Sequence, residues 1–295
     1  MLQCQQAGKV ALTNIMLEII STMARRYVQK EWPELFPSLI AQLKQQQDPN
    51  VVNTVFSCVK KICKKYRYMF RCDALYTEMN YVIELFSQTL IDTLGFCINQ
   101  AQQNSQTQDV GLIKCLYGVM NSILHIIESI LSQEELPDFY EDNLPQIMEA
   151  CFFIIAQDYP QFDKVPDEII KARGKVVSLL CLYNFKFSEY FVKYEQEAFQ
   201  AIWSLIDQNK VQATKKSENL IKTTMKYLGD VINNPSKVDF IKQNLQKIFD
   251  ILILPNIALT AEDQEEYEDD PHAFIRNDLE ESDVETRRRN CLKFV

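Results

Sequence analysis

The sequence predicts an all-α protein built from serial helix pairs, and three observations lead to this prediction. The 295 residues include only six glycines, too few for the tight turns of a sheet-rich protein or the connecting loops of a parallel α/β fold. Hydrophobic residues make up 47% of the chain, which is enough to form an extensive core. They recur at steps of three and four, the period of an amphipathic helix, and no stretch alternates strictly as a half-buried strand does.

The elements follow from breaks in this pattern. The first is a single helix at about residues 8–30. Polar or proline-containing connectors then separate five expected helix pairs, such as QQNSQTQD at 102–109 and DYPQFDKVPD at 158–167. One clear apolar stripe consists of Leu112, Leu116, Val119, Ile123, Ile127 and Ile130. The pairs are placed at 32–67, 73–133, 137–185, 188–233 and 236–295.

The pairs indicate a solenoid. They average roughly 53 residues, slightly more than the ~40–47 residues of HEAT and armadillo repeats. A two-helix unit cannot bury both of its apolar faces alone, so it must stack on its neighbours. We therefore expect a right-handed α-α superhelix, a HEAT/armadillo-like solenoid of about five to six helix pairs over residues 1–295. A compact helical bundle is the alternative, but no segment resembles a long return crossover.

The charge is concentrated near the end of the sequence. The net charge is −9, yet residues 261–285 alone hold twelve carboxylates against one arginine. Residues 286–295 add four basic groups, which leaves residues 1–260 nearly neutral at −2. We expect no general nucleic-acid-binding surface on such a body.

The sequence offers no catalytic or metal-binding constellation. It contains no Gly-rich phosphate loop, no GxSxG and no HExxH. The nine cysteines form no CxxC pair and lie mostly in apolar stretches, as reduced and buried thiols do. The only histidines are His125, inside an apolar helix, and His272, in the charged segment. We therefore predict no enzyme, no cofactor and no metal, and because no apolar run approaches ~18 residues, no membrane insertion.

A second charged feature is the basic cluster KKICKKYR at 60–67. It lies at the end of an expected helix, where cations complement the helix dipole. A solvated polar edge is the simpler interpretation, and a contact for an acidic partner is the alternative.

Residues 254–281 form an acidic insertion within the last helix pair. Pro255 is expected to end a helix, and repulsion between like charges to keep the following chain open up to Pro271. After a possible short helix at AFIRNDL, Ser282 and Glu285 have capping-box spacing, so a new helix is expected from Asp283. Its expected i,i+4 ion pairs are Asp283–Arg287 and Glu285–Arg289. The acids themselves are either a solvated spacer or a docking element for a basic partner.

This last segment carries a resemblance. The order LPNIALTAEDQEEYEDDPHAFIRNDLEESDVETRRRNC resembles the signature of the exportin-2 group, the importin-α re-exporters of the β-karyopherin family. Asn277, Glu281 and Glu285 depart from the family pattern. Three other stretches are also similar to the family, and the resemblance spans nearly the whole chain: WPELFPSLI, YRYMFRCDALYTEMNYVIELF and LPDFYEDN.

The resemblance implies a HEAT solenoid without enzymatic activity that carries importin-α out of the nucleus together with Ran-GTP, and so shuttles between nucleus and cytoplasm. It also implies that the acidic insertion lies on the inner surface, where it contacts Ran or cargo or holds the free receptor closed. The contact candidates are Glu262, Asp263, Glu265, Glu266, Glu268, Asp269 and Asp270, followed by Arg276, Arg287, Arg288 and Arg289. Family members are about three times longer, so this chain is expected to be an internal segment.

Two other functions remain open at this point. One is a generic helical-repeat scaffold in which the acidic segment is a spacer. The other is a related nuclear import receptor, because import receptors also carry acidic insertions.

Overall fold

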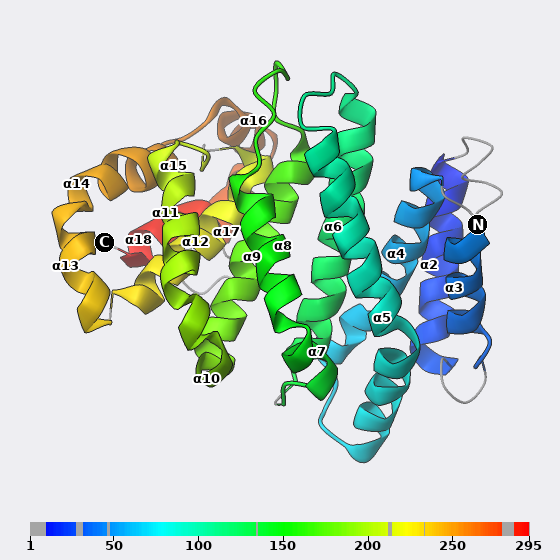
Figure 1. Ribbon diagram of the computed structural model, residues 1–295. Coiled ribbons are helices and arrows are strands. Elements are labelled where there is room, and N and C mark those ends of the chain that lie inside the picture. Colours follow the sequence, from blue (N-terminus) through cyan, green and yellow to red (C-terminus); the bar gives the residue numbers. More distant parts are fainter. Residues whose placement is uncertain are drawn as a thin grey trace. The chain divides into compact units, whose positions relative to one another are not determined.

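The computed structural model describes residues 10–27, 32–45, 48–133, 135–211, 214–232, 234–278 and 286–294. Every regular element within these ranges is a helix, so the all-α prediction is confirmed (Figure 1). The chain divides into two compact units, Met1–Ala172 and Arg173–Val295.

The first unit stacks its helices in two layers (Figure 1). In one layer α4 packs between α2 and α6, and in the other α5 packs between α3 and α8. The two layers also contact each other, through α3 on α4 and α5 on α6. The helices are α2 (Val10–Tyr27), α3 (Leu35–Gln45), α4 (Pro49–Cys63), the 3₁₀ turn η1 (Lys64–Arg67), α5 (Asp73–Gln103), α6 (Val110–Leu131), α7 (Asp138–Asp142), α8 (Leu144–Ala156) and the start of α9 (Asp167–Lys186).

Aromatic rings join the layers of this unit. The ring centroid of Phe86 on α5 lies 5.8 Å from that of Phe36 on α3 and 5.6 Å from that of Phe56 on α4. All three side chains are buried. Such pairs contribute roughly 0.5–1.5 kcal/mol beyond the area they bury, so this trio ties the first helix pair to the second.

The basic cluster at 60–67 is largely paired within the protein. Lys61 forms an ion pair with Glu18 of α2. Lys65 pairs with Glu78 of α5 at 2.6 Å. The Lys65–Glu78 pair is largely buried, so the expectation of a solvated polar edge is wrong for Lys65, whereas Lys61 and Glu18 stay partly exposed.

Arg67 makes several partly buried contacts with α6. It forms an ion pair with Glu128 of α6, and its Nε donates to the Ser129 hydroxyl at 2.8 Å. One Nη also donates to the carbonyl of His125 at 3.2 Å. His125 therefore belongs to the packed helix α6, as its apolar surroundings predicted.

The second unit also buries its helices against one another. Trp203 and Phe199 of α11 both pack edge-on against Phe240 of α13. Helix α18 packs on α12 and α15. The helices are the rest of α9, α10 (Ser188–Phe191), η2 (Val192–Tyr194), α11 (Glu195–Asp207), η3 (Lys215–Ser217), α12 (Glu218–Val231), α13 (Pro235–Gln243), α14 (Leu245–Ile248), a π-helical turn (Phe249–Ile253), α15 (Leu254–Ile257), α16 (Ala261–Asp269), α17 (Pro271–Asp278) and α18 (Arg287–Phe294).

Pro255 does not end its helix where the sequence predicted. The backbone continues through Pro255 to Ile257. The π-helical turn Phe249–Ile253 immediately precedes this segment. A π turn interrupts the regular i→i−4 ladder and makes room for a residue that lacks an N–H donor. Proline is thereby accommodated inside the helix.

Most thiols of the described residues are buried, as predicted. Burial raises the pKa of Cys58, Cys97 and Cys151 to about 12. A thiol reacts as its thiolate, so these groups are inert at neutral pH. Cys72, at the N-cap of α5, is exposed.

Among the residues that the structure describes, two helices are long and apolar enough to cross a bilayer by length and composition alone, although the sequence predicted no such run. They are α5 and α6. Both contribute core side chains and contact helices on either side within the first unit. Core helices of ordinary globular proteins pass the same test, so the finding is weak evidence for a membrane span.

We predict that Arg67→Met destabilises the first unit by about 2–4 kcal/mol, because it leaves the buried Glu128 carboxylate without its ion-pair partner. Urea unfolding measures this cost. The double variant Arg67→Met/Glu128→Gln should recover much of the lost stability. As a control, Lys61→Met should cost no more than about 1 kcal/mol because the Lys61–Glu18 pair is partly solvated. Equal costs for the two single variants would contradict the prediction.

Candidate functional site

The acidic run is a helix, and the expected open chain is wrong. Helix α16 spans Ala261–Asp269 and begins with a capping box. The Thr260 hydroxyl accepts from Asp263 N–H at 3.2 Å, and an Asp263 carboxylate oxygen accepts from Thr260 N–H at 2.7 Å. Glu262 and Asp263 lie in the first turn, where negative charge is stabilised by the helix dipole. Cap and dipole together outweigh the screened repulsion among the exposed acids.

A second short helix folds back on the first. Asp270 ends α16, and its carboxylate then accepts from Ala273 N–H at 2.9 Å at the start of α17. Pro271 occupies the first position of α17, where its missing N–H costs nothing. The rings of Tyr267 and Phe274 pack edge to face at 5.7 Å. Residues 260–278 therefore form a helical hairpin, which we call the acidic hairpin.

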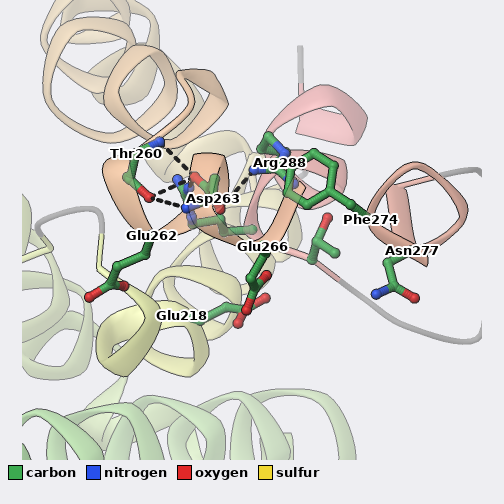
Figure 2. A pocket seen from close by; sticks show the side chains of 10 residues that line it. Glu218, Thr260, Glu262, Asp263, Glu266, Phe274, Asn277 and Arg288 are labelled. Carbon is green, nitrogen blue, oxygen red and sulfur yellow. Dashed lines mark hydrogen bonds and ion pairs between the residues drawn. The ribbon is translucent and has the colours of Figure 1, made fainter. Parts of the chain in front are cut away.

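Asp263 fixes this hairpin to α18. It forms ion pairs with Arg287 and with Arg288, the latter at 2.9 Å. Arg287 also donates to the carbonyl of Asn256 at 3.2 Å, which connects α18 to α15. The Arg288 guanidinium lies over the Phe274 ring, 4.6 Å from its centroid. One carboxylate and two arginines thus join α15, α16, α17 and α18 (Figure 2).

The ion pairs and hydrogen bonds determine the charge state of Asp263. Burial by itself would raise its pKa. The hydrogen bonds from Thr260 and the positive charges of Arg287 and Arg288 act in the opposite direction and are together stronger. The pKa of Asp263 is consequently lowered below its ordinary value, and the carboxylate is ionised at neutral pH.

A pocket of about 140 Å³ lies beside the cluster. Its walls include Glu218 of α12, Glu262 and Glu266 of α16, and the Phe274 ring. Figure 2 shows the Glu218 and Glu266 side chains pointing toward each other. The described residues contain no group of three or more His, Cys, Asp or Glu side chains arranged to hold a metal ion.

The structure separates the predicted contact residues into two sets. Asp263, Arg287 and Arg288 form the internal cluster, and Arg289 is also buried. The other candidates lie on the surface of the acidic hairpin, exposed to solvent: Glu262, Glu265, Glu266, Glu268, Asp269, Asp270 and Arg276. The predicted helix start at Asp283 and the acids of the two predicted i,i+4 pairs fall outside the described residues.

Sequence reasoning missed three features of the site. The capping box was visible as Thr-x-x-Asp at 260–263, a pattern that marks a helix start. The contacts of Phe274 and Asn256 with the arginines left no local signal, because they join residues 14 to 31 positions apart in the sequence.

Three comparisons with known proteins identify the family and the fold. A family model described as Cse1 matches residues 62–295. The chain is 29% identical to exportin-2 of Drosophila melanogaster and covers 29% of its length, with 97% of this chain aligned. It is 28% identical to the importin alpha re-exporter of Saccharomyces cerevisiae and again covers 29% of it, with 94% of this chain aligned.

A solved structure agrees with these relatives. The exportin Cse1 in its cargo-free, cytoplasmic state superposes with a TM-score of 0.82 at 27% identity. The match covers 94% of this chain and 30% of that one. The chain belongs to the Cse1 family, and its fold class is the HEAT-repeat solenoid of that family. It spans about 29% of the length of the curated relatives.

We predict that the acidic hairpin loosens at low pH. Because the pKa of Asp263 is lowered by folding, its carboxylate stabilises the hairpin fully above the ordinary aspartate pKa of ~3.9. This stabilisation is lost as the pH falls through the lower pKa of the folded state. Asp263→Asn should therefore reduce hydrogen-exchange protection of residues 261–269 about 10-fold or more at pH 7, and the difference from wild type should vanish at the acid end. Glu265→Gln, on the same helix but exposed, is the control. A difference between Asp263→Asn and wild type that does not change with pH would contradict the assignment.

Proposed function

We propose that this chain is a segment of a nuclear export receptor that carries importin-α from the nucleus to the cytoplasm in a Ran-GTP-dependent complex. The observation that carries the proposal is the continuous match to exportin-2 and importin-α re-exporters over 94–98% of the chain. Such a receptor binds and transports its cargo without catalysing a reaction, and it shuttles between nucleus and cytoplasm.

The acidic hairpin is the candidate contact surface within the proposed receptor. Its exposed acids include Glu265, Glu268 and Asp269. Surfaces of one charge attract partners of the opposite charge and raise association rates. A basic surface of Ran or of importin-α is the complementary partner. The ion pairs of Asp263 with Arg287 and Arg288 would act indirectly, because they hold the hairpin in place.

The central experiment measures binding of the receptor to importin-α with Ran-GTP and with Ran-GDP, by isothermal titration calorimetry or fluorescence anisotropy. The proposal predicts tight binding of importin-α with Ran-GTP and at least ~10-fold weaker binding with Ran-GDP. Binding that ignores the nucleotide would favour a generic scaffold instead. Absence of binding to importin-α in both states would remove the export function.

We further predict that the exposed acids contribute the salt dependence of this complex. The triple variant Glu265→Gln/Glu268→Gln/Asp269→Asn should flatten the slope of log Kd against log salt and slow association. Asp263 is left intact so that the hairpin stays docked. The matched control is Glu189→Gln/Glu197→Gln/Asp239→Asn, which changes the net charge equally at exposed positions outside the hairpin. Equal slopes for the two triple variants would reduce the hairpin acids to a solvated spacer.

A further inference from the structure

An exposed aromatic tip stands out on the first unit. It consists of Tyr68, Met69, Phe70 and Arg71, in the connection between η1 and α5. The Phe70 side chain is 95% exposed and that of Tyr68 is 75% exposed. Single apolar side chains on a surface are ordinary, but consecutive large ones at a loop tip indicate an interaction site. Arg71 and Lys64 beside them are also exposed.

The tip is held in place from both sides. On one side the Tyr66 hydroxyl donates to Glu78 at 2.9 Å, and Arg67 is anchored on α6. On the other side, Leu75 N–H donates to the Cys72 carbonyl at 2.9 Å in the first turn of α5. A segment fixed at both ends loses little conformational entropy when it binds. The aromatic tip is therefore preorganised to insert into a partner.

A cleft of about 390 Å³ in the same unit is lined by apolar and acidic side chains, which complement the aromatic and basic side chains of the tip. It lies between the first half of α5 and the segment that enters α7, and it falls within the ~300–1,000 Å³ range of small-ligand pockets, so it can hold one aromatic side chain. In Figure 1 this segment and the connection into α5 lie at the same end of the unit. The lining includes apolar Met79, Ile83 and Phe139 and exposed acids Glu84, Glu135 and Asp138.

We propose that the aromatic tip of one copy of this chain docks into the acidic cleft of a second copy. Phe70 enters the apolar part of the cleft, and Arg71 with Lys64 faces the carboxylates at its rim. The residues before the tip are anchored on helices of their own chain, Tyr66 on α5 and Arg67 on α6.

Each copy carries both a tip and a cleft, so a two-fold axis forms the contact twice. Such isologous dimers are the commonest closed assemblies. The two contacts together are smaller than the 20–30 residues per side of a standard stable interface. We therefore expect a weak dimer, with a Kd on the order of 10 μM. The inference is independent of the proposed transport function.

Sedimentation velocity between about 1 and 100 μM tests the proposal. The parent protein is expected to pass from monomer to dimer over this range. Phe70→Ala and Arg71→Glu should each weaken the dimer at least ~10-fold, as should Glu84→Lys/Glu135→Lys. Phe185→Ala removes another exposed aromatic side chain, in the second unit, and should have no effect. Circular dichroism melts verify that each variant is folded.

Charge exchange between copies distinguishes docking from misfolding. Mixing Arg71→Glu with Glu84→Lys/Glu135→Lys should restore a heterodimer, because one contact is then native and the other has both signs reversed. A parent that stays monomeric at 100 μM, a Phe70→Ala variant that dimerises normally, or a mixture without a heterodimer would each overturn the proposal. The parent could also stay monomeric while Phe70→Ala loses affinity for importin-α or for phosphatidylserine vesicles. That result would assign the tip to that partner and overturn docking between copies.

Discussion

Stacking of apolar helix faces is the constraint on which this structure depends. A two-helix unit buries one apolar face inside itself and leaves another that only a neighbouring unit can cover. In the first unit α4 has a helix on each side within its layer, and so does α5. Apolar side chains make up most of the buried residues, and charge is concentrated at some helix ends and connections. The basic cluster at 60–67, the aromatic tip and the acidic hairpin all occupy such positions.

The helix pairs were predictable because their signal is local. Whether a side chain of α6 is buried depends on its place in a 3.6-residue period, which the sequence shows directly. The partners of the basic cluster were not predictable in the same way. Glu18 and Glu128 lie in other helices, 43 and 61 positions from Lys61 and Arg67. A sequence pattern gives the charge of such a cluster but not the distant acid that neutralises it.

The acidic run folds although its like charges repel, because the repulsion is weaker than the helix cap and the ion pair that oppose it. Repulsion between exposed like charges is screened and amounts to a few tenths of a kcal/mol per pair. A capping box contributes on the order of 1 kcal/mol, and a partly buried ion pair adds more. The run therefore folds once Thr260 caps it and Asp263 meets Arg287. The cap was visible in the sequence, whereas the arginine contact, 24 residues away, appears only in the folded chain.

This division of roles among the acids has a consequence for binding. Releasing the hairpin from α18 would leave Arg287, which is 5% exposed, as a buried cation without its carboxylate. That cost exceeds what a surface ion pair with a partner returns. A basic partner of the kind proposed would therefore gain more from the exposed acids such as Glu265 and Glu268 than from competing for Asp263. It would meet a surface that is already folded. An open acidic loop would lose conformational entropy on binding, whereas the folded hairpin has lost it already.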